Sequence, residues 1–254
     1  MKGEIGGLVV ATPRFSEYAA ADPGNVRDGN VRDKVTDIIS RIADIGIVPV
    51  IVLADPDLAR PLADALAAGD LPCAEVTFRT PRAAEALKLM AQDSRLVVGA
   101  GTVLTVEQVD AAIEAGATYI VTPGYSRDVV RACQDRDVPV IPGVATPTEI
   151  QMALQDGIML VKFFPAEAIG GTRALSAMAA PFPGLRFIPT GGISQENLED
   201  YLALPSVAAV GGSWMAPAGL VSQHKWADIT RLAAEAVAAV ARHRPATSEI
   251  PVIP

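Results

Sequence analysis

A single lysine stands inside a short apolar segment, Val161-Lys162-Phe163-Phe164-Pro165, which has the pattern of a buried strand. An ammonium group that leaves water must find an anionic partner or give up its proton. A neutral lysine amine attacks carbonyl carbons and forms Schiff bases. The segment therefore makes Lys162 a candidate nucleophile toward a carbonyl substrate, which the rest of the chain has to support. The alternative is a structural ion pair with a buried carboxylate.

A second segment, Ala74–Thr80, alternates polar and apolar residues. Side chains of a strand point alternately to its two faces, so Glu75, Thr77 and Arg79 share one face. In a barrel the apolar face meets the helices, and the polar face lines the interior or its opening. We therefore expect Glu75 to lie beside Lys162, as an acid–base group next to an amine. A structural pair of Glu75 with Arg79 or Lys162 is the alternative, because unpaired buried charges are costly.

Two turns with paired glycines, 189–193 and 210–214, follow apolar runs near the end of the chain. Loops after the last two strands of a (β/α)8 barrel commonly hold phosphate. The turns expose backbone amides, and they carry two hydroxyl side chains, so together they predict a phosphate site. Its candidate residues are Thr190, Gly191, Gly192, Gly211, Gly212 and Ser213.

A third small-residue turn, Gly99-Ala100-Gly101-Thr102, has two possible interpretations. It could let a ligand approach the backbone, with the Thr102 hydroxyl as a donor. It could equally be only a tight turn, which small residues favour. A fourth turn, 142–147, reads as structural, with Thr146 as the cap of the next helix.

These candidate residues lie on elements that repeat along the chain as a short apolar strand followed by an alanine-rich helix. The alternation predicts parallel pairing, and eight units predict a single (β/α)8 TIM barrel of the α/β class. An open doubly wound sheet is the alternative, but the turn after the first strand, 53–56, lacks the glycines of a dinucleotide site. The predicted strands are Val48–Leu53, Ala74–Phe78, Leu96–Gly99, Tyr119–Val121, Val138–Ile141, Leu160–Phe164, Phe187–Pro189 and Ala208–Val210.

An amphipathic helix is predicted to precede the barrel, beginning at Asp33 and ending at Gly46. Residues 1–32 lack sustained periodicity and predict a partly ordered arm, with an added strand or helix as the alternative. The barrel is expected to span 33–245, including a last outer helix at Trp226–Arg242. A proline-rich tail, 246–254, follows it.

Composition limits the class of protein. The 254 residues are 50% hydrophobic and 20% charged, which suits one domain with a large core, and the net charge of −8 disfavours nucleic acid and anionic membranes as partners. No apolar run is long enough for a transmembrane helix, and the N-terminal apolar patch is too short for a secretory signal. The two cysteines, Cys73 and Cys133, suit a reduced cytoplasmic interior.

The two histidines, His224 and His243, lie far from the predicted strand ends. This position argues against a His-ligated metal site and against a Ser-His-Asp triad. Lysine imine chemistry needs neither a metal nor a cofactor, so we expect none.

Six motifs together resemble the class I 2-keto-3-deoxy-6-phosphogluconate (KDPG) and 4-hydroxy-2-oxoglutarate (KHG) aldolases. The resemblance covers about residues 33–240, in order and with compatible spacing. The motifs are Gly46–Ile51, Glu75–Thr80, Gly99–Thr102, Lys162–Glu167, Pro189–Ile193 and Gly211–Trp214. The N-terminal arm departs from it, because that arm is longer than the family usually carries.

The resemblance implies a (β/α)8 barrel that assembles as a homotrimer, with Lys162 as the Schiff-base lysine and Glu75 as the general acid/base. It implies that the substrate is held by three groups of residues: Arg79 and Thr102 at the pyruvate carboxylate, Pro123 and Phe164 beside the pyruvyl group, and the residues of the two paired-glycine turns at the far end and its phosphate.

The expected function is a Schiff-base aldolase that cleaves KDPG to pyruvate and glyceraldehyde 3-phosphate. KHG cleavage as the main activity is one alternative. A phosphate-binding barrel isomerase that uses Lys162 and Glu75 without a covalent step is a second. A non-catalytic sugar-phosphate sensor is a third.

Overall fold

The computed structural model describes residues 29–243, with side chains from residue 36 onward. Most of the expected arm and all of the expected tail therefore lie outside the described residues, and the domain limits stay a prediction. The first described helix, α2 (Gly29–Ile45), begins before the expected start at Asp33. It ends next to Gly46, as the sequence predicted, and runs directly into the first strand.

The described strands are short, and every pair of them is parallel. Each of the eight predicted strands overlaps an observed one, and the limits differ by a few residues. The observed strands are β1 (Ile47–Ile51), β2 (Cys73–Thr77), β3 (Val97–Gly101), β4 (Ile120–Val121), β5 (Val140–Ile141), β6 (Gly143–Val144), β7 (Leu160–Phe163), β8 (Arg186–Pro189) and β9 (Val210–Gly212).

The strands form two parallel sheets, with the orders β5-β4-β3-β2-β1-β9 and β6-β7-β8. The fifth predicted strand, Val138–Ile141, overlaps only β5, and an additional strand, β6, follows it after Pro142. Gly143 and Val144, which were assigned to a turn, in fact pair with β7. Proline has no N–H to donate to a strand ladder, which accounts for the break at this point.

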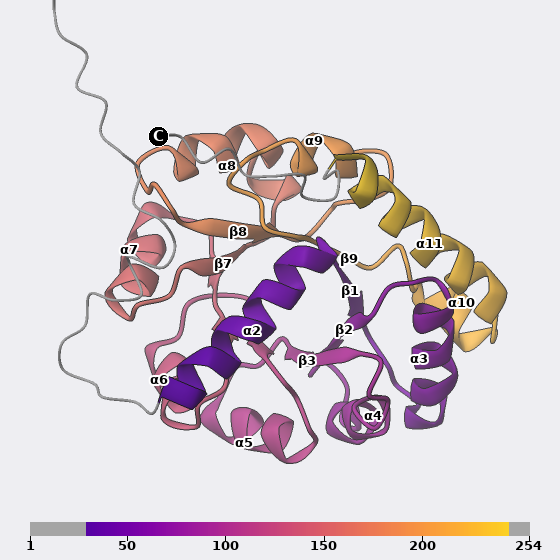
Figure 1. The fold of residues 1–254 in the computed structure, drawn as a ribbon. Coiled ribbons are helices and arrows are strands. Elements are labelled where there is room, and N and C mark those ends of the chain that lie inside the picture. The colour runs from indigo at the N-terminus through magenta and orange to yellow at the C-terminus, as the bar shows by residue number, and fades with distance from the viewer. Residues whose placement is uncertain (1–28, 244–254) are drawn as a thin grey trace, which may run out of the picture.

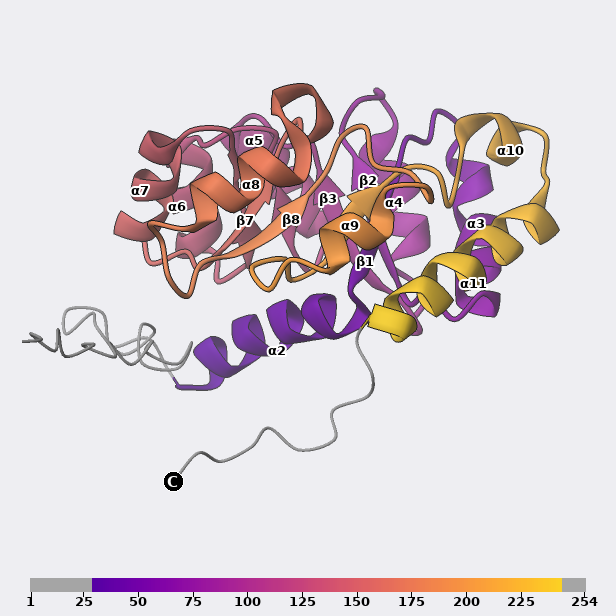
Figure 2. The same cartoon turned by 90° about the horizontal axis from the view of Figure 1, so that it is seen from above.

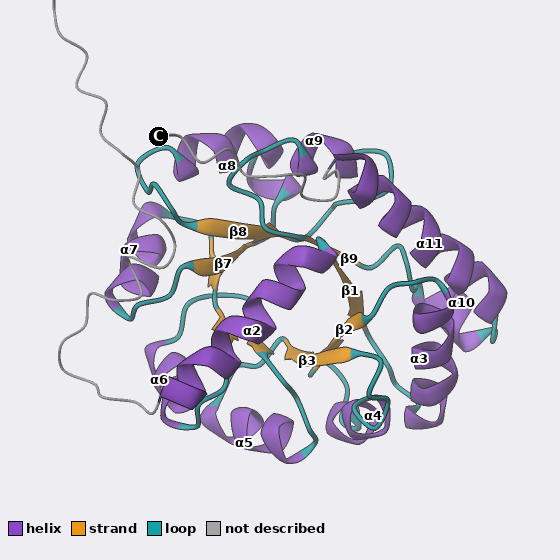
Figure 3. Ribbon diagram, in the orientation of Figure 1, coloured by secondary structure: helices purple, strands orange, loops and turns teal. Residues whose placement is uncertain are grey.

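Helices surround the strands, and Figures 1 and 3 show them as an outer layer around the strands. The apolar stripe of α3, at Ala59, Leu62, Ala63 and Leu66, has helical spacing and is buried. The helical segments after β1 mostly alternate with the strands along the chain. In chain order they are η1 (Pro56–Leu58), α3 (Ala59–Ala68), α4 (Ala83–Met90), α5 (Val106–Glu114), α6 (Arg127–Asp135), α7 (Pro147–Gln155), η2 (Glu167–Ile169), α8 (Gly171–Ala179), α9 (Leu198–Leu202), α10 (Ala218–Ser222) and α11 (Trp226–His243).

Helix α2 lies across one end of the strands rather than in the outer layer (Figure 2). Because α2 leads directly into β1, this is the end at which the parallel strands begin. Ile42 of α2 is fully buried there and belongs to the core. The carboxyl ends of the strands therefore lie at the opposite end, away from α2. Between residues 29 and 243, the structure contains no helix with the length and apolarity to cross a membrane.

Candidate active site

The structure brings Lys162 of β7 and Glu75 of β2 together, although they lie on different sheets. Lys162 Nζ is 3.3 Å from Glu75 Oε1, and both residues are buried, at 5% and 4% relative exposure. The Nζ atom also lies 5.3 Å from the centre of the Phe164 ring. This confirms the expected meeting of the two side chains, and it excludes the alternative pair between Glu75 and Arg79 among the described residues.

Strand β3 makes the space that Glu75 occupies. Residue Gly101 lies in register with Thr77 of β2, and a Cβ atom on Gly101 would overlap the Glu75 carboxylate. A Cβ atom on Gly99 would likewise overlap the Tyr119 ring. The two glycines therefore provide room for protein side chains, a use that neither interpretation of this turn had foreseen.

Tyr119 completes the buried polar layer on the α2 side of the pair. Its hydroxyl donates to the Ala74 carbonyl at 3.0 Å, and Cys73 Sγ donates to the Ile47 carbonyl at 3.1 Å. Burial, together with the charge of Glu75, raises the pKa of both groups well above the usual range. Both therefore stay protonated near neutral pH, and Glu75 has neutral neighbours on this side.

A cavity of about 10 Å³ lies against Lys162, Glu75 and Tyr119, with Ile42 of α2 among its lining residues. A larger hollow, of about 240 Å³, lies between α8 and α9 and does not include Lys162. Volume alone would favour the larger hollow as the reaction site. Of these two spaces, only the smaller one lies against a buried amine next to a carboxylate, and its volume is that of about one water molecule.

Arg79 and Thr102 follow β2 and β3 at the carboxyl ends of the strands. Arg79 is exposed and makes no ion pair with another described residue. Thr102 is half-buried, with a φ of 55°, a left-handed conformation that costs a threonine of the order of 1–3 kcal/mol. Such strain is typical of functional sites, so the Thr102 backbone supports a ligand-binding role for this turn.

Pro123 and Phe164 lie near the paired strands β6 and β7. Pro123 follows β4, and its carbonyl lies so close to Gly143 that a Cβ atom there would overlap it. Gly143 is in register with Lys162. Phe164 directly follows β7 and is half-buried. Pro123 thus lies next to the residue that pairs with Lys162, and the Phe164 ring lies near the Lys162 amine itself.

The two paired-glycine turns meet at the carboxyl ends of β8 and β9. A parallel bridge joins Thr190 to Gly211, and a Cβ atom on Gly191 would lie 3.3 Å from the Phe164 ring. The Thr190 hydroxyl oxygen is buried without a hydrogen-bond partner. Ser213 is exposed at the end of the second turn. This oxygen lies where a Cβ atom on Gly211 would overlap it, so it faces the backbone of the second turn.

Two parts of this region were not identified from the sequence. Tyr119 was assigned only to a strand, and its alternation alone does not reveal that it lies beneath Glu75. Glu167 was noted only within a motif, whereas its carboxylate accepts a hydrogen bond from Tyr201. Only the position of Glu167, five residues after the lysine, could have drawn attention to it.

The family model for KDPG and KHG aldolase matches residues 38–232 of the chain. A 2-dehydro-3-deoxy-phosphogluconate aldolase of Haemophilus influenzae is 45% identical over 201 residues, which are 79% of this chain and 95% of the relative. A KHG/KDPG aldolase of Escherichia coli is also 45% identical, over 75% of this chain and 90% of the relative.

Solved structures give the same similarity. A KDPG aldolase from Legionella pneumophila, with pyruvate captured as a covalent carbinolamine intermediate, has a TM-score of 0.75 and 42% identity. The matched region is 77% of this chain and 96% of the Legionella pneumophila chain. A Zymomonas mobilis aldolase of this type, with 3-phosphoglycerate, has a TM-score of 0.76 and 44% identity over 82% of this chain and 96% of that one.

Proposed function

This chain belongs to the KDPG and KHG aldolase family, and we propose that it is a class I aldolase that acts through a Schiff base on Lys162. Its substrate is KDPG, which it cleaves to pyruvate and D-glyceraldehyde 3-phosphate. The observation that carries the proposal is the buried contact of 3.3 Å between Lys162 Nζ and Glu75 Oε1. A nucleophile and a proton carrier at this separation can act on the same carbonyl, which supports the proposal.

The reaction begins when Lys162 gives a proton to Glu75 and its amine attacks the C2 carbonyl of the substrate. Glu75 returns that proton to the departing hydroxyl, and loss of water gives a protonated imine. The C3–C4 bond then breaks, and its electron pair moves toward the protonated imine to form an enamine. Glu75 takes the proton of the C4 hydroxyl, through a water molecule, and glyceraldehyde 3-phosphate leaves. Glu75 returns a proton to C3 of the enamine, and hydrolysis of the imine releases pyruvate and restores the amine.

The other site residues hold the substrate in this proposal. Arg79 and Thr102 bind the carboxylate next to C2, and Pro123 and Phe164 flank the pyruvyl group. A guanidinium without an ion-pair partner and a strained threonine with a half-buried side chain support these roles. The phosphate lies at the two glycine turns, where the N–H groups of Gly192 and Ile193 and the exposed Ser213 hydroxyl support binding of an anion.

We also infer that the two sheets close into one (β/α)8 barrel. Only Pro142 separates β5 from β6 along the chain, and the bridges Phe187–Val207 and Thr190–Gly211 connect β8 with the β9 region. The homotrimer remains a proposal that comes from the family resemblance. Light scattering on the purified chain would measure its mass in solution, and a monomer would contradict the trimer.

The proposal is tested by incubating the protein with pyruvate and borohydride, followed by mass spectrometry of the peptides. We expect one reduced pyruvyl group, on Lys162, and the same label in the presence of EDTA. A label on Lys88, or none, would contradict the mechanism. Turnover of a phosphorylated sugar without a trapped imine would favour the isomerase, and phosphate binding without turnover would favour the sensor.

KHG cleavage as the main activity stays the second candidate. The family model covers both activities, and the Escherichia coli relative carries both names. Steady-state kinetics with KDPG and KHG separate the two.

A further inference from the structure

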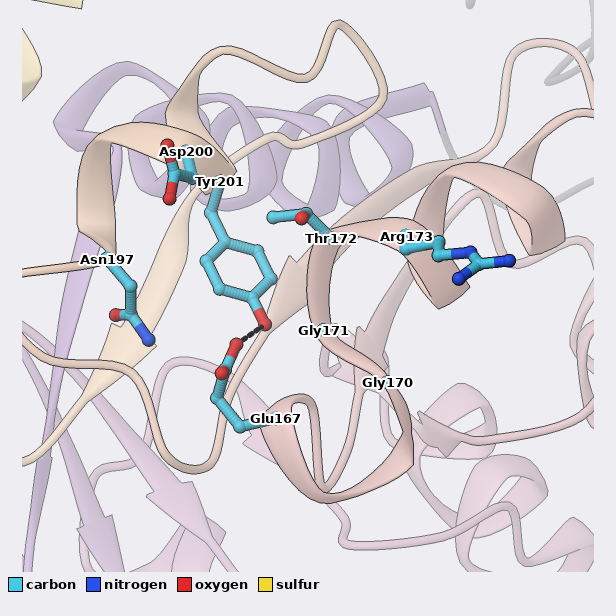
Figure 4. Close-up of a pocket in the computed structure, with 8 residues that line it drawn as sticks. All are labelled: Glu167, Gly170, Gly171, Thr172, Arg173, Asn197, Asp200 and Tyr201. Carbon is cyan, nitrogen blue, oxygen red and sulfur yellow. Dashed lines mark hydrogen bonds between the residues drawn. The ribbon is translucent and has the colours of Figure 1, made fainter.

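The larger hollow, between α8 and α9, contains a hydrogen bond that the reaction does not use. The Tyr201 hydroxyl donates to the Glu167 carboxylate inside it, as Figure 4 shows. Tyr201 is fully buried, and burial together with Glu167 raises the pKa of its hydroxyl above the usual range. The hydroxyl is therefore a permanent donor near neutral pH. The hollow is lined by Glu167, Gly170, Gly171, Thr172, Arg173, Asn197, Asp200 and Tyr201.

Glu167 also touches the first glycine turn. Its N–H donates to the Gly191 carbonyl at 3.0 Å. A Cβ atom on Gly192 would lie 2.6 Å from the Glu167 Cβ, which is closer than real Cβ atoms approach one another. The base of the Glu167 side chain therefore lies directly against the turn, while its carboxylate is held by α9 through Tyr201.

The backbone carbonyls of Thr190, Gly191 and Gly192 each accept a hydrogen bond from a neighbouring donor. The Ala166 N–H donates to the Thr190 carbonyl at 2.8 Å, and Asn197 Nδ2 donates to the Gly192 carbonyl at 3.3 Å. Asn197 is itself held, because its Oδ1 accepts from the Ser194 N–H at 2.8 Å. In contrast, the N–H groups of Gly192 and Ile193 have no hydrogen-bond partner among residues 29–243. Amides that are left free in this way are suited to an anion.

We propose that Glu167, Tyr201 and Asn197 are positioning residues that fix the Gly191–Gly192 turn so that its amides receive the phosphate of the substrate. They act through the backbone of the turn and do not touch the substrate. Tyr201 has a further effect, because it holds the Glu167 carboxylate on the α9 side, where its charge does not compete with the phosphate. This inference rests on the proposed function.

The first test is Tyr201→Phe, which removes the hydroxyl and keeps the buried ring. We expect KM for KDPG to rise about tenfold, with kcat and the rate of imine formation with pyruvate within about twofold. KM for KHG, which carries no phosphate, should change by less than about threefold. Equal losses on both substrates, or unchanged kinetics, would overturn the inference.

The matched control is Tyr125→Phe, since the Tyr125 hydroxyl donates to the Asp156 carboxylate in the same kind of contact on another part of the molecule. It should leave the ratio of the two KM values unchanged. A second variant, Asn197→Ala, removes the donor to the Gly192 carbonyl without disturbing Tyr201. It should raise KM for KDPG in the same selective way, and an unchanged ratio would contradict the role of Asn197.

Binding of inorganic phosphate separates failure of this inference from failure of the proposed function. Phosphate should raise the Tm of the wild-type protein, and its affinity should fall about tenfold in Tyr201→Phe, because the amides lose their fixed direction. If the protein binds phosphate in this Tyr201-dependent way but forms no imine, only the aldolase proposal is wrong. If the wild type forms the imine but does not bind phosphate, or if the variant binds phosphate as tightly, the inference is wrong.

Discussion

At the scale of single residues, the buried pair of Lys162 and Glu75 makes a poor stabilising device. Removing two charges from water costs several kcal/mol per ion, and well-packed apolar residues of similar volume are often at least as stable. The pair lies in an interior where its neighbours on the α2 side, Cys73 and Tyr119, stay protonated near neutral pH. A contribution to stability therefore does not explain why these two residues are buried together, and a role in a reaction would explain it.

The substitution Glu75→Gln separates these two roles. Glutamine keeps the shape of the side chain but cannot carry a proton, so imine formation with pyruvate should persist. Turnover of KDPG should fall by about 10²–10⁴-fold, the usual contribution of acid–base catalysis. Glu85→Gln, at an exposed carboxylate on α4 that pairs with Arg82, is the charge-matched control and should leave turnover unchanged. Near-normal turnover of Glu75→Gln would mean that Glu75 is only an ion-pair partner.

Ser213 tests the opposite end of the substrate. Its hydroxyl is suited to a phosphate dianion, and a charge-assisted hydrogen bond is worth roughly 1.5–3 kcal/mol. We expect kcat/KM for KDPG to exceed that for KHG by at least about tenfold, which needs only roughly 1.4 kcal/mol. Ser213→Ala should narrow this ratio, and Ser222→Ala, on α10, should not. Equal values of kcat/KM in the wild type would make KHG the main substrate.

At the scale of the elements, β3 shows what alternation alone does not reveal. The period of two placed Glu75 and Lys162 on the interior faces of their strands, and the structure confirms their contact. The same reasoning could not show that Gly99 and Gly101 leave space for Tyr119 and Glu75. That use depends on which side chains cross from neighbouring strands, and the residues concerned are distant in the sequence.

Gly101→Ala should therefore damage the site through β3. The added methyl group overlaps the Glu75 carboxylate, so the carboxylate must move or the strand must shift. Overpacking of this kind typically costs about 1–3 kcal/mol of unfolding free energy. Turnover should fall by about 10²-fold, since small misplacements of a catalytic group have effects of that size. Imine trapping should persist, because Lys162 is unchanged.

The control for this substitution is Gly219→Ala on α10, where an added Cβ atom meets nothing within 4 Å. It should leave turnover unchanged and the unfolding free energy equal or higher by up to about 1 kcal/mol. Thermal unfolding and steady-state kinetics on the two variants provide both measurements. If both variants behave like the wild type, β3 does not restrict Glu75.

At the scale of the whole molecule, the repeat of strand and helix predicted the order of the elements well. It did not predict the additional strand β6 after Pro142, because β6 forms by pairing with β7 while β5 pairs with β4. It also did not identify the contacts of Glu167, Tyr201 and Asn197 with one another and with the Gly191–Gly192 turn. These residues become neighbours only when α9 packs beside η2, a long-range contact that carries no local periodic signal.

The cysteines give a prediction that involves the whole core. Cys73 and Cys133 are both fully buried, and burial raises the pKa of the Cys133 thiol to about 12 and that of Cys73 further. The pKa of each thiol in the folded protein is thus above the unfolded value of about 8.5. Each contribution to stability is fully present below pH of about 8.5 and is lost as the pH rises toward the folded pKa.

The free energy of unfolding should therefore decline above pH of about 9, by up to about 1.4 kcal/mol per pH unit for each thiol. Denaturant unfolding between pH 8 and pH 11, at constant ionic strength, measures this slope. Cys133→Ala removes one titrating group, so the unfolding free energy of this variant should decline less steeply with pH, by up to about 1.4 kcal/mol per pH unit. At pH 8 the variant should be less stable than the wild type, because the substitution leaves a cavity. Part of the decline should remain, because burial also raises the pKa of Tyr119 and Tyr201. A wild-type curve that stays flat up to pH 11 would show that these groups ionise without opening the core.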